Sequence, residues 1–173
     1  MQIRRLRGSD DTAAFSCGDA GLDRFLSSHA WRNQDALGIG VTYVAPAGER
    51  IAAFMTLAAG SVARDHVRES ERATLPRYPL PVVRLARLGV DSRAQGEGLG
   101  GALVDFALHV AWAMRERVGC IGVAVDALPE AVAYYERLGF ESIAVLEGSS
   151  ALRPRPVPMH LWLNDTRGLL DGA

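Results

Sequence analysis

Residues 88–104 read LGVDSRAQGEGLGGALV, and the middle of this stretch holds four closely spaced glycines, Gly96, Gly98, Gly100 and Gly101. A short apolar run precedes them and a long amphipathic run follows, which predicts a strand, a polar connection and a helix. A helix that starts at glycines offers N–H donors and a partial positive charge, so it suits an anion. A tight turn alone would need fewer glycines. We therefore expect a pyrophosphate at this loop, with Arg93 close enough to add a charge.

Two other phosphate-binding patterns fit this loop less well. Gly96, Gly98 and Gly101 satisfy the G-x-G-x-x-G dinucleotide fingerprint, but that fingerprint requires a strand that runs directly into the first glycine. Here DSRAQ separates Val90 from Gly96, and too little chain follows for a second nucleotide-binding half. The Walker pattern fails because the sequence contains no lysine.

Hydrophobic periodicity around the loop predicts one α/β domain with a mixed sheet. Helices are expected over 20–36, with Asp19 as N-cap, over 98–118, and over 129–138, where Gly139 ends the helix. The charged segment 64–74 is expected to be a solvated short helix or an excursion of the chain. The expected strands span 41–45 and 51–57 as a hairpin, 82–90, 121–125, and 157–163 after the proline-marked loop 153–158.

Composition and charge exclude several classes of protein. The formal net charge of −1 gives no global attraction to a polyanion, which argues against an indiscriminate nucleic-acid binder. All nineteen basic residues are arginine, which we attribute to composition bias more than to phosphate recognition. Cys17 and Cys120 lack metal-ligand spacing and are expected to pack as small apolar residues. Without a signal peptide or an apolar run of membrane length, a cytoplasmic protein with no membrane contact is expected.

Two segments, in this order along the chain, resemble two motifs of one enzyme superfamily. The segment 95–100, QGEGLG, resembles the Q/R-x-x-G-x-G/A motif of the GNAT superfamily of acetyl-CoA-dependent N-acetyltransferases, and the segment 134–140, YYERLGF, resembles its second motif. The order of elements matches along essentially the whole chain. The resemblance implies a single N-acetyltransferase domain over 1–173. Its fold would be α/β, with a mixed, mostly antiparallel central sheet, helices on both faces, and a splayed strand pair at the cofactor site.

The resemblance also implies a set of cofactor-binding residues for acetyl-CoA, the co-substrate, with no metal. Pantetheine would pair with the backbone of Leu88 and Val90, and the Val90 N–H would stabilise the oxyanion. The pyrophosphate would be held by the loop residues Gln95, Gly96, Glu97, Gly98, Leu99 and Gly100.

Tyr135 matches the tyrosine that commonly gives a proton to the leaving thiolate in this superfamily, and it would contact the cofactor. A phenol with a pKa of about 10 stays protonated at neutral pH. Tyr134 is the rival, because adjacent helical residues point about 100° apart and only one can face the cofactor. Without the resemblance, both rings could simply pack. The sequence identifies no general base among Glu136, Asp126 and His109.

Three further stretches resemble one subgroup of this superfamily. Residues 15–30 (FSCGDAGLDRFLSSHA), 43–62 (YVAPAGERIAAFMTLAAGSV) and 75–91 (LPRYPLPVVRLARLGVD) resemble the GNAT toxins of bacterial toxin–antitoxin pairs. This implies acetylation of the α-amino group of charged tRNA, a block of translation, and a ribbon-helix-helix antitoxin as partner; a homodimer is also compatible.

An RNA substrate requires cations near the site, and four arginines bracket the strand and its loop: Arg77, Arg84, Arg87 and Arg93. Arg84 and Arg87 cannot share a face, because alternate strand residues point to opposite sides.

Two other functions stay open at the level of sequence. The near-neutral charge suits a GNAT that acetylates a small-molecule amine or a protein N-terminus. A non-catalytic acetyl-CoA-binding protein belongs to a different class, and Tyr135 argues against it.

Overall fold

A computed structural model describes residues 2–143 and 155–166. Its strands are β1 (Arg4–Arg5), β2 (Val41–Ala47), β3 (Arg50–Val62), β4 (Leu80–Val90), β5 (Gly122–Ala127), β6 (Glu141–Ser142) and β7 (Val157–Trp162). Its α-helices are α1 (Ala20–Ser28), α2 (Ala30–Asp35), α3 (Glu69–Arg72), α4 (Leu99–Arg117) and α5 (Val132–Arg137). The 3₁₀ turns are η1 (Arg64–His66), η2 (Pro129–Ala131) and η3 (Leu163–Thr166).

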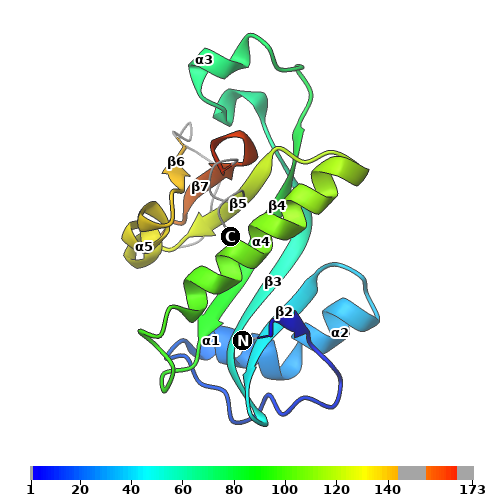
Figure 1. Cartoon of the computed structure of the whole chain (residues 1–173), viewed down its shortest axis with the longest axis vertical. Coiled ribbons are helices and arrows are strands. Elements are labelled where there is room, and N and C mark those ends of the chain that lie inside the picture. Colours follow the sequence, from blue (N-terminus) through cyan, green and yellow to red (C-terminus); the bar gives the residue numbers. More distant parts are fainter. Residues whose placement is uncertain (1, 144–154, 167–173) are drawn as a thin grey trace. The chain divides into compact units, whose positions relative to one another are not determined.

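The strands of the described residues form one sheet in the order β1-β2-β3-β4-β5-β7-β6 (Figure 1). The pairs β1–β2, β2–β3, β5–β7 and β6–β7 are antiparallel. This confirms the expected α/β class with a mostly antiparallel sheet. In the same part of the chain, no helix is both long and apolar enough to span a membrane.

The chain divides into two compact units that interleave in sequence. The first unit comprises residues 1–59 and 85–107, and the second comprises 60–84 and 108–173. The strands β3 and β4 and the helix α4 each pass from one unit to the other.

The first unit is organised around Phe54, which is fully buried on β3. The ring of Phe15 meets it edge-on at 5.3 Å, and the ring of Phe25 from α1 stacks on it at 6.3 Å. The cluster around it consists of Leu6, Phe15, Leu26, Ala30, Val44, Ile51 and Phe54. Gln34 on α2 is buried because its amide is used twice, donating to the Leu6 carbonyl and accepting from the Thr42 N–H, at 3.0 Å each.

The helix expected at 20–36 is two helices in the structure. Asp19 caps α1 as predicted, accepting from the N–H groups of Gly21 and Leu22 at 2.7 and 3.0 Å. At His29 the backbone leaves helical geometry, with φ at −124°. Leu26 on α1 and Ala30 on α2 both belong to the Phe54 cluster, and the sequence prediction of one continuous helix was wrong at His29.

The second unit contains β5, β7 and β6, whose pairing places His160 on β7 between Ala124 of β5 and Glu141 of β6. Its buried cluster consists of Val62, Val67, Leu80, Val82, Ala124 and Trp162. Gly122 is required where β5 approaches β7 closely, because a Cβ there would lie 2.5 Å from the Leu161 carbonyl oxygen.

Most expected elements are confirmed. The hairpin strands extend further than predicted, to 41–47 and 50–62, and the charged stretch at 64–74 forms η1 and α3. The expected loop at 153–158 lies partly outside the described residues. Cys17 and Cys120 are both free thiols, and burial raises the pKa of each.

Candidate functional site

The glycine loop, defined here as residues 91–98, connects the end of β4 to the start of α4 within the first unit. Gly96 and Gly98 have φ values of +84° and +79°, a region that favours glycine. Among the described residues, the N–H groups from Gln95 to Gly98 donate no hydrogen bond, and the first helical bond runs from the Ala102 N–H to the Gly98 carbonyl. The loop and the first turn of α4 therefore present free N–H groups.

The peptide groups of Leu88 and Val90 face away from β3. The Asp91 N–H donates to the Ala52 carbonyl on β3 at 2.8 Å, and peptide groups alternate sides along a strand. The Gln95 side chain donates to the Val90 carbonyl at 3.1 Å, on the side that this alternation predicts. The two strand residues expected to pair with a ligand thus direct their peptide groups away from the β3 ladder.

The glycine loop is anchored to the segment that precedes α1. The Gln95 amide also donates to the Cys17 carbonyl at 3.1 Å, and the Ser92 N–H donates to the Ser16 carbonyl at 2.9 Å. Asp91 is buried, and its ion pair and hydrogen bonds with Arg93 hold the pKa of its carboxyl well below the usual range. These contacts set the starting direction of the loop.

The four arginines proposed for RNA have different surroundings. In the first unit, Arg93 pairs with Asp91, and the Arg87 guanidinium lies 5.2 Å from the centre of the Phe25 ring. In the second unit, Arg84 pairs with Asp126 on β5, and Arg77 is exposed. Arg84 and Arg87 thus have different partners, a carboxylate for Arg84 and an aromatic ring for Arg87.

The tyrosine turn, defined here as residues 134–140, lies in the second unit and includes the end of α5. The Tyr135 carbonyl accepts from both the Leu138 and the Phe140 N–H groups, and Gly139 at φ +89° completes the turn. The Tyr135 ring meets the rings of Tyr134 and Phe140 edge-on, each at 5.3 Å.

Tyr135 is only 7% exposed, and burial, with a smaller contribution from Tyr134, raises its pKa to about 12. The phenol therefore stays protonated far above neutral pH and is a proton donor at any physiological pH. Tyr134 is less buried. Of the three bases considered from the sequence, Asp126 is held by Arg84, whereas Glu136 and His109 are exposed.

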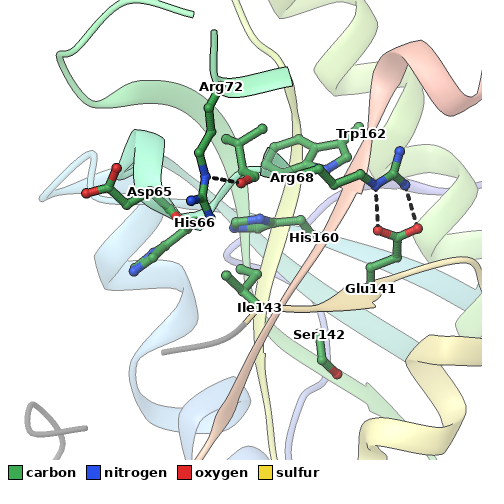
Figure 2. A pocket seen from close by; sticks show the side chains of 10 residues that line it. Asp65, His66, Arg68, Arg72, Glu141, Ser142, Ile143, His160 and Trp162 are labelled. Atoms are coloured by element: carbon green, nitrogen blue, oxygen red, sulfur yellow. Dashed lines mark hydrogen bonds and ion pairs between the residues drawn. The ribbon is translucent and has the colours of Figure 1, made fainter. Parts of the chain in front are cut away.

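A pocket of about 150 Å³ lies in the second unit, around the buried side chain of His160 (Figure 2). Its lining residues are Asp65, His66, Val67, Arg68, Arg72, Glu141, Ser142, Ile143, His160 and Trp162. Arg68 pairs with Glu141, and the Arg72 guanidinium donates to two backbone carbonyls. Burial, together with the charges of His66 and Arg84, lowers the pKa of His160 to about 4. None of the residues predicted from the sequence as site residues lines this pocket. The lowered pKa keeps the His160 imidazole in its neutral form at neutral pH.

In the part of the chain that the structure describes, no group of three or more His, Cys, Asp or Glu residues is placed to hold a metal ion.

The sequence prediction missed the hydrogen bonds by which Asp91, Ser92 and Ser16 anchor the glycine loop. An acidic residue at a strand end, followed two positions later by Arg93, was the available signal for a local ion pair. Nothing in the local sequence indicated Ser16, which lies 75 residues before Asp91.

Comparisons with known proteins agree with this geometry. Residues 38–142 match the acetyltransferase (GNAT) domain family. A tRNA-acetylating toxin of Mycobacterium tuberculosis (strain ATCC 25618 / H37Rv) is 34% identical, over 96% of this chain and 95% of that protein. The structure of AtaT complexed with acetyl-methionyl-tRNAfMet superimposes with a TM-score of 0.85 at 26% identity, covering 98% of both chains. That of AtaTR bound with acetyl-CoA gives 0.79 at 27% identity, covering 98% of this chain and 97% of that chain.

Proposed function

The chain belongs to the GNAT acetyltransferase family, and from this premise we propose that it transfers the acetyl group of acetyl-CoA to the α-amino group of an aminoacyl-tRNA. Its enzyme class, an acetyl-CoA-dependent N-acetyltransferase, follows from the family. The observation that carries the proposal is the glycine loop between β4 and α4, whose N–H groups from Gln95 to Gly98 lack partners among the described residues. We propose that residues 1–173 act as one catalytic domain.

The pyrophosphate of acetyl-CoA fits the loop for a physical reason. The positive φ values of Gly96 and Gly98 let the backbone curve so that successive N–H groups are available, and the start of α4 adds a partial positive charge. The proposed ligand set of the loop is Gln95, Gly96, Glu97, Gly98, Leu99 and Gly100. Leu88 and Val90 are the proposed backbone partners of the pantetheine arm, because their peptide groups point away from β3.

The bound thioester supplies the acetyl group, and three tasks fall to the protein: to orient it, to stabilise the carbonyl oxygen as charge builds, and to protonate the departing sulfur. We assign the second task to the Val90 N–H and the third to the Tyr135 hydroxyl. The raised pKa of Tyr135 keeps its proton available. The α-amine of an aminoacyl ester needs little help from a base, because the ester lowers its pKa below the usual 7.7 to 8.0, roughly, of a chain terminus.

The choice of charged tRNA as substrate rests on two relatives, the tRNA-acetylating toxin and AtaT in complex with acetyl-methionyl-tRNAfMet. We propose Arg77, Arg84, Arg87 and Arg93 as its phosphate contacts. The Arg87 guanidinium is exposed and lies over the Phe25 ring, and Arg93 is half-exposed within the glycine loop. Because the net charge is −1, these local cations have to supply the attraction.

We further propose that the protein works in the cytoplasm, where charged tRNA and acetyl-CoA are found, and that an antitoxin of the ribbon-helix-helix type neutralises it. AtaTR, a relative, was solved with acetyl-CoA, and a further structure shows AtaT bound to the C-terminus of the antitoxin AtaR. A short neighbouring gene for a ribbon-helix-helix protein is expected. We also propose a homodimer, which light scattering of the purified protein would test.

Expression of the chain alone tests the proposed toxicity. We expect growth and translation to stop in cells that produce the wild-type protein and to continue with Tyr135→Phe produced at the same level. Cells could instead grow normally although their lysate contains wild-type protein that acetylates a small amine. The substrate would then be a small-molecule amine or a protein N-terminus, and not charged tRNA. Acetyl-CoA binding without transfer to any amine would instead identify a non-catalytic binding protein.

A further inference from the structure

The strongest unassigned feature of the first unit is a hydrogen-bonded group that joins the start of the glycine loop to the segment before α1, and we call it the loop clasp. It consists of Ala14, Ser16, Asp91, Ser92 and Arg93. Asp91 lies at its centre with 2% of its surface exposed. Its carboxylate accepts from the Arg93 Nε and Nη2 at 2.7 Å each, from the Arg93 N–H at 3.0 Å, and from the Ser16 N–H at 3.3 Å.

The clasp joins two segments that are distant in sequence. The Arg93 Nη2 also donates to the Ala14 carbonyl at 2.8 Å. The Ser16 carbonyl accepts from both the N–H and the hydroxyl of Ser92, at 2.9 and 3.0 Å. Each segment donates hydrogen bonds to the other, so the segment 14–16 fixes the position of residues 91–93. Gly96 and Gly98 come shortly after these residues in the same loop.

Stability alone is a weak reason for such a buried charge. The Asp91 carboxylate loses its hydration on burial, and the attraction to half-exposed Arg93 has to offset that cost before the pair stabilises the fold. Its geometric effect is different, since a bidentate pair fixes the direction of the side chains and of the backbone that carries them. Arg93 also neutralises the carboxylate, so a negative charge does not oppose an anion at the loop.

We propose that Asp91 and Arg93 are positioning residues for acetyl-CoA: the loop clasp holds the glycine loop in the conformation that binds the pyrophosphate. Neither residue needs to touch the reacting atoms. This inference rests on the proposed function, because it requires coenzyme A at the glycine loop. It adds that the affinity for the pyrophosphate part of the coenzyme depends on a contact with the segment before α1.

The chain contains a matched control for this proposal. Asp10 accepts from both Nη atoms of Arg4 and from the Arg7 N–H, each at 2.8 Å, and the Asp10 side chain is 11% exposed. This ion pair lies in the first unit and also joins an aspartate to a guanidinium and a backbone N–H, but it belongs to the β1 region. Asp10→Asn should therefore remove a similar interaction without reaching the glycine loop.

The experiment compares Asp91→Asn, Arg93→Gln and Asp10→Asn with the wild type. Calorimetric titration with coenzyme A measures the pyrophosphate-dependent affinity, and kcat/KM for transfer from S-acetylpantetheine, which lacks the pyrophosphate, measures the rest of the site. We expect Asp91→Asn and Arg93→Gln to raise the Kd for coenzyme A about tenfold, a loss of about 1.4 kcal/mol, and we expect Asp91→Asn to leave kcat/KM for S-acetylpantetheine unchanged. Asp10→Asn should change neither quantity.

Arg93→Gln keeps the test valid if Asp91→Asn does not fold, because the Arg93 side chain is half-exposed. The proposal is overturned if the folded clasp variants bind coenzyme A like the wild type. It is also overturned if Asp91→Asn loses affinity for coenzyme A and kcat/KM for S-acetylpantetheine in the same proportion. Wild-type protein that binds no coenzyme A would overturn the proposed function itself.

Discussion

The glycine loop and the tyrosine turn both bend at glycines with positive φ, but they position different chemical groups, backbone N–H donors in the loop and a phenol in the turn. In the loop, Gly96 and Gly98 are exposed, and the groups proposed to bind the ligand are backbone N–H donors. In the turn, Gly139 lets the chain fold back so that the Tyr135 carbonyl accepts two hydrogen bonds and its ring is buried among aromatic rings. One region is suited to bind an anion, and the other to hold a proton on a phenol.

Tyr135→Phe should give the largest effect, because it removes the proposed proton donor while keeping the ring that packs against Phe140. We expect kcat for acetyl transfer to fall about 100-fold or more, the range of general acid catalysis, with the Kd for acetyl-CoA almost unchanged. Tyr134→Phe, measured in parallel, should keep most of the activity. Equal losses in the two variants would remove the distinction between the adjacent tyrosines.

Gly98→Val tests the backbone conformation of the loop. No atom lies within 4 Å of a Cβ added at Gly98, so the expected damage comes from φ at +79° and not from a clash. The strain of about 1–2 kcal/mol should distort the loop and raise the Kd for acetyl-CoA about tenfold or more.

Gly38→Val is the matched control for Gly98→Val. Gly38 also lies in the first unit, has φ at +63°, and has open space around an added Cβ. It should lose similar stability in thermal unfolding but keep its affinity for acetyl-CoA. A loss of affinity in both variants would mean that Gly98 acts only through the stability of the unit.

Gln95→Ala should have a smaller effect on the loop. It removes the hydrogen bonds to the Cys17 and Val90 carbonyls but leaves the loop clasp intact. A net loss of about 0.5–1.5 kcal/mol for a neutral hydrogen bond corresponds to a few-fold rise in the Kd for acetyl-CoA. A rise larger than that of Gly98→Val would place the main control of the loop in this side chain.

The pH dependence of the free energy of unfolding should report on His160 in the second unit, which lies outside the glycine loop. Burial lowers the pKa of His160 to about 4, below its ordinary value of 6.5. The unfolded chain therefore takes up a proton first, and the stability contributed by neutral His160 is lost as the pH falls from about 6.5 to about 4. His160→Phe should flatten the decline in the free energy of unfolding across this range, measured with denaturant.

His29→Gln, at an exposed position of the first unit, is the control for that measurement and should keep the wild-type pH dependence. An unchanged slope in His160→Phe would show that other groups govern stability between pH 4 and 6.5.

Local patterns predicted those parts of the fold that depend on neighbouring residues. The periodicity of residues 98–118 and the glycines before them predicted α4 with its start one residue away from the observed Leu99. The cap at Asp19 was predicted because its hydrogen bonds reach only Gly21 and Leu22. The break at His29 was not predicted, because no glycine or proline stands next to this residue in the sequence.

Contacts between distant segments could not be predicted in this way. Asp91 meets Ser16 across 75 residues, and no periodicity in either segment indicates the other. The placement of β7 between β5 and β6 is likewise a property of the assembled sheet. The resemblance to a known family supplied the proposed roles of Val90 and Tyr135, which the residues alone would have left as a strand end and a packed ring.

Mass spectrometry of aminoacyl-tRNA after incubation with the purified protein and acetyl-CoA tests the central claim most directly. We expect one acetyl group on the α-amine of the amino acid of at least one charged tRNA, far less of it with Tyr135→Phe, and none when acetyl-CoA is omitted. The mixture of charged tRNAs will also show which amino acid is modified. Active protein that acetylates a small amine but leaves every aminoacyl-tRNA unmodified would contradict the proposal.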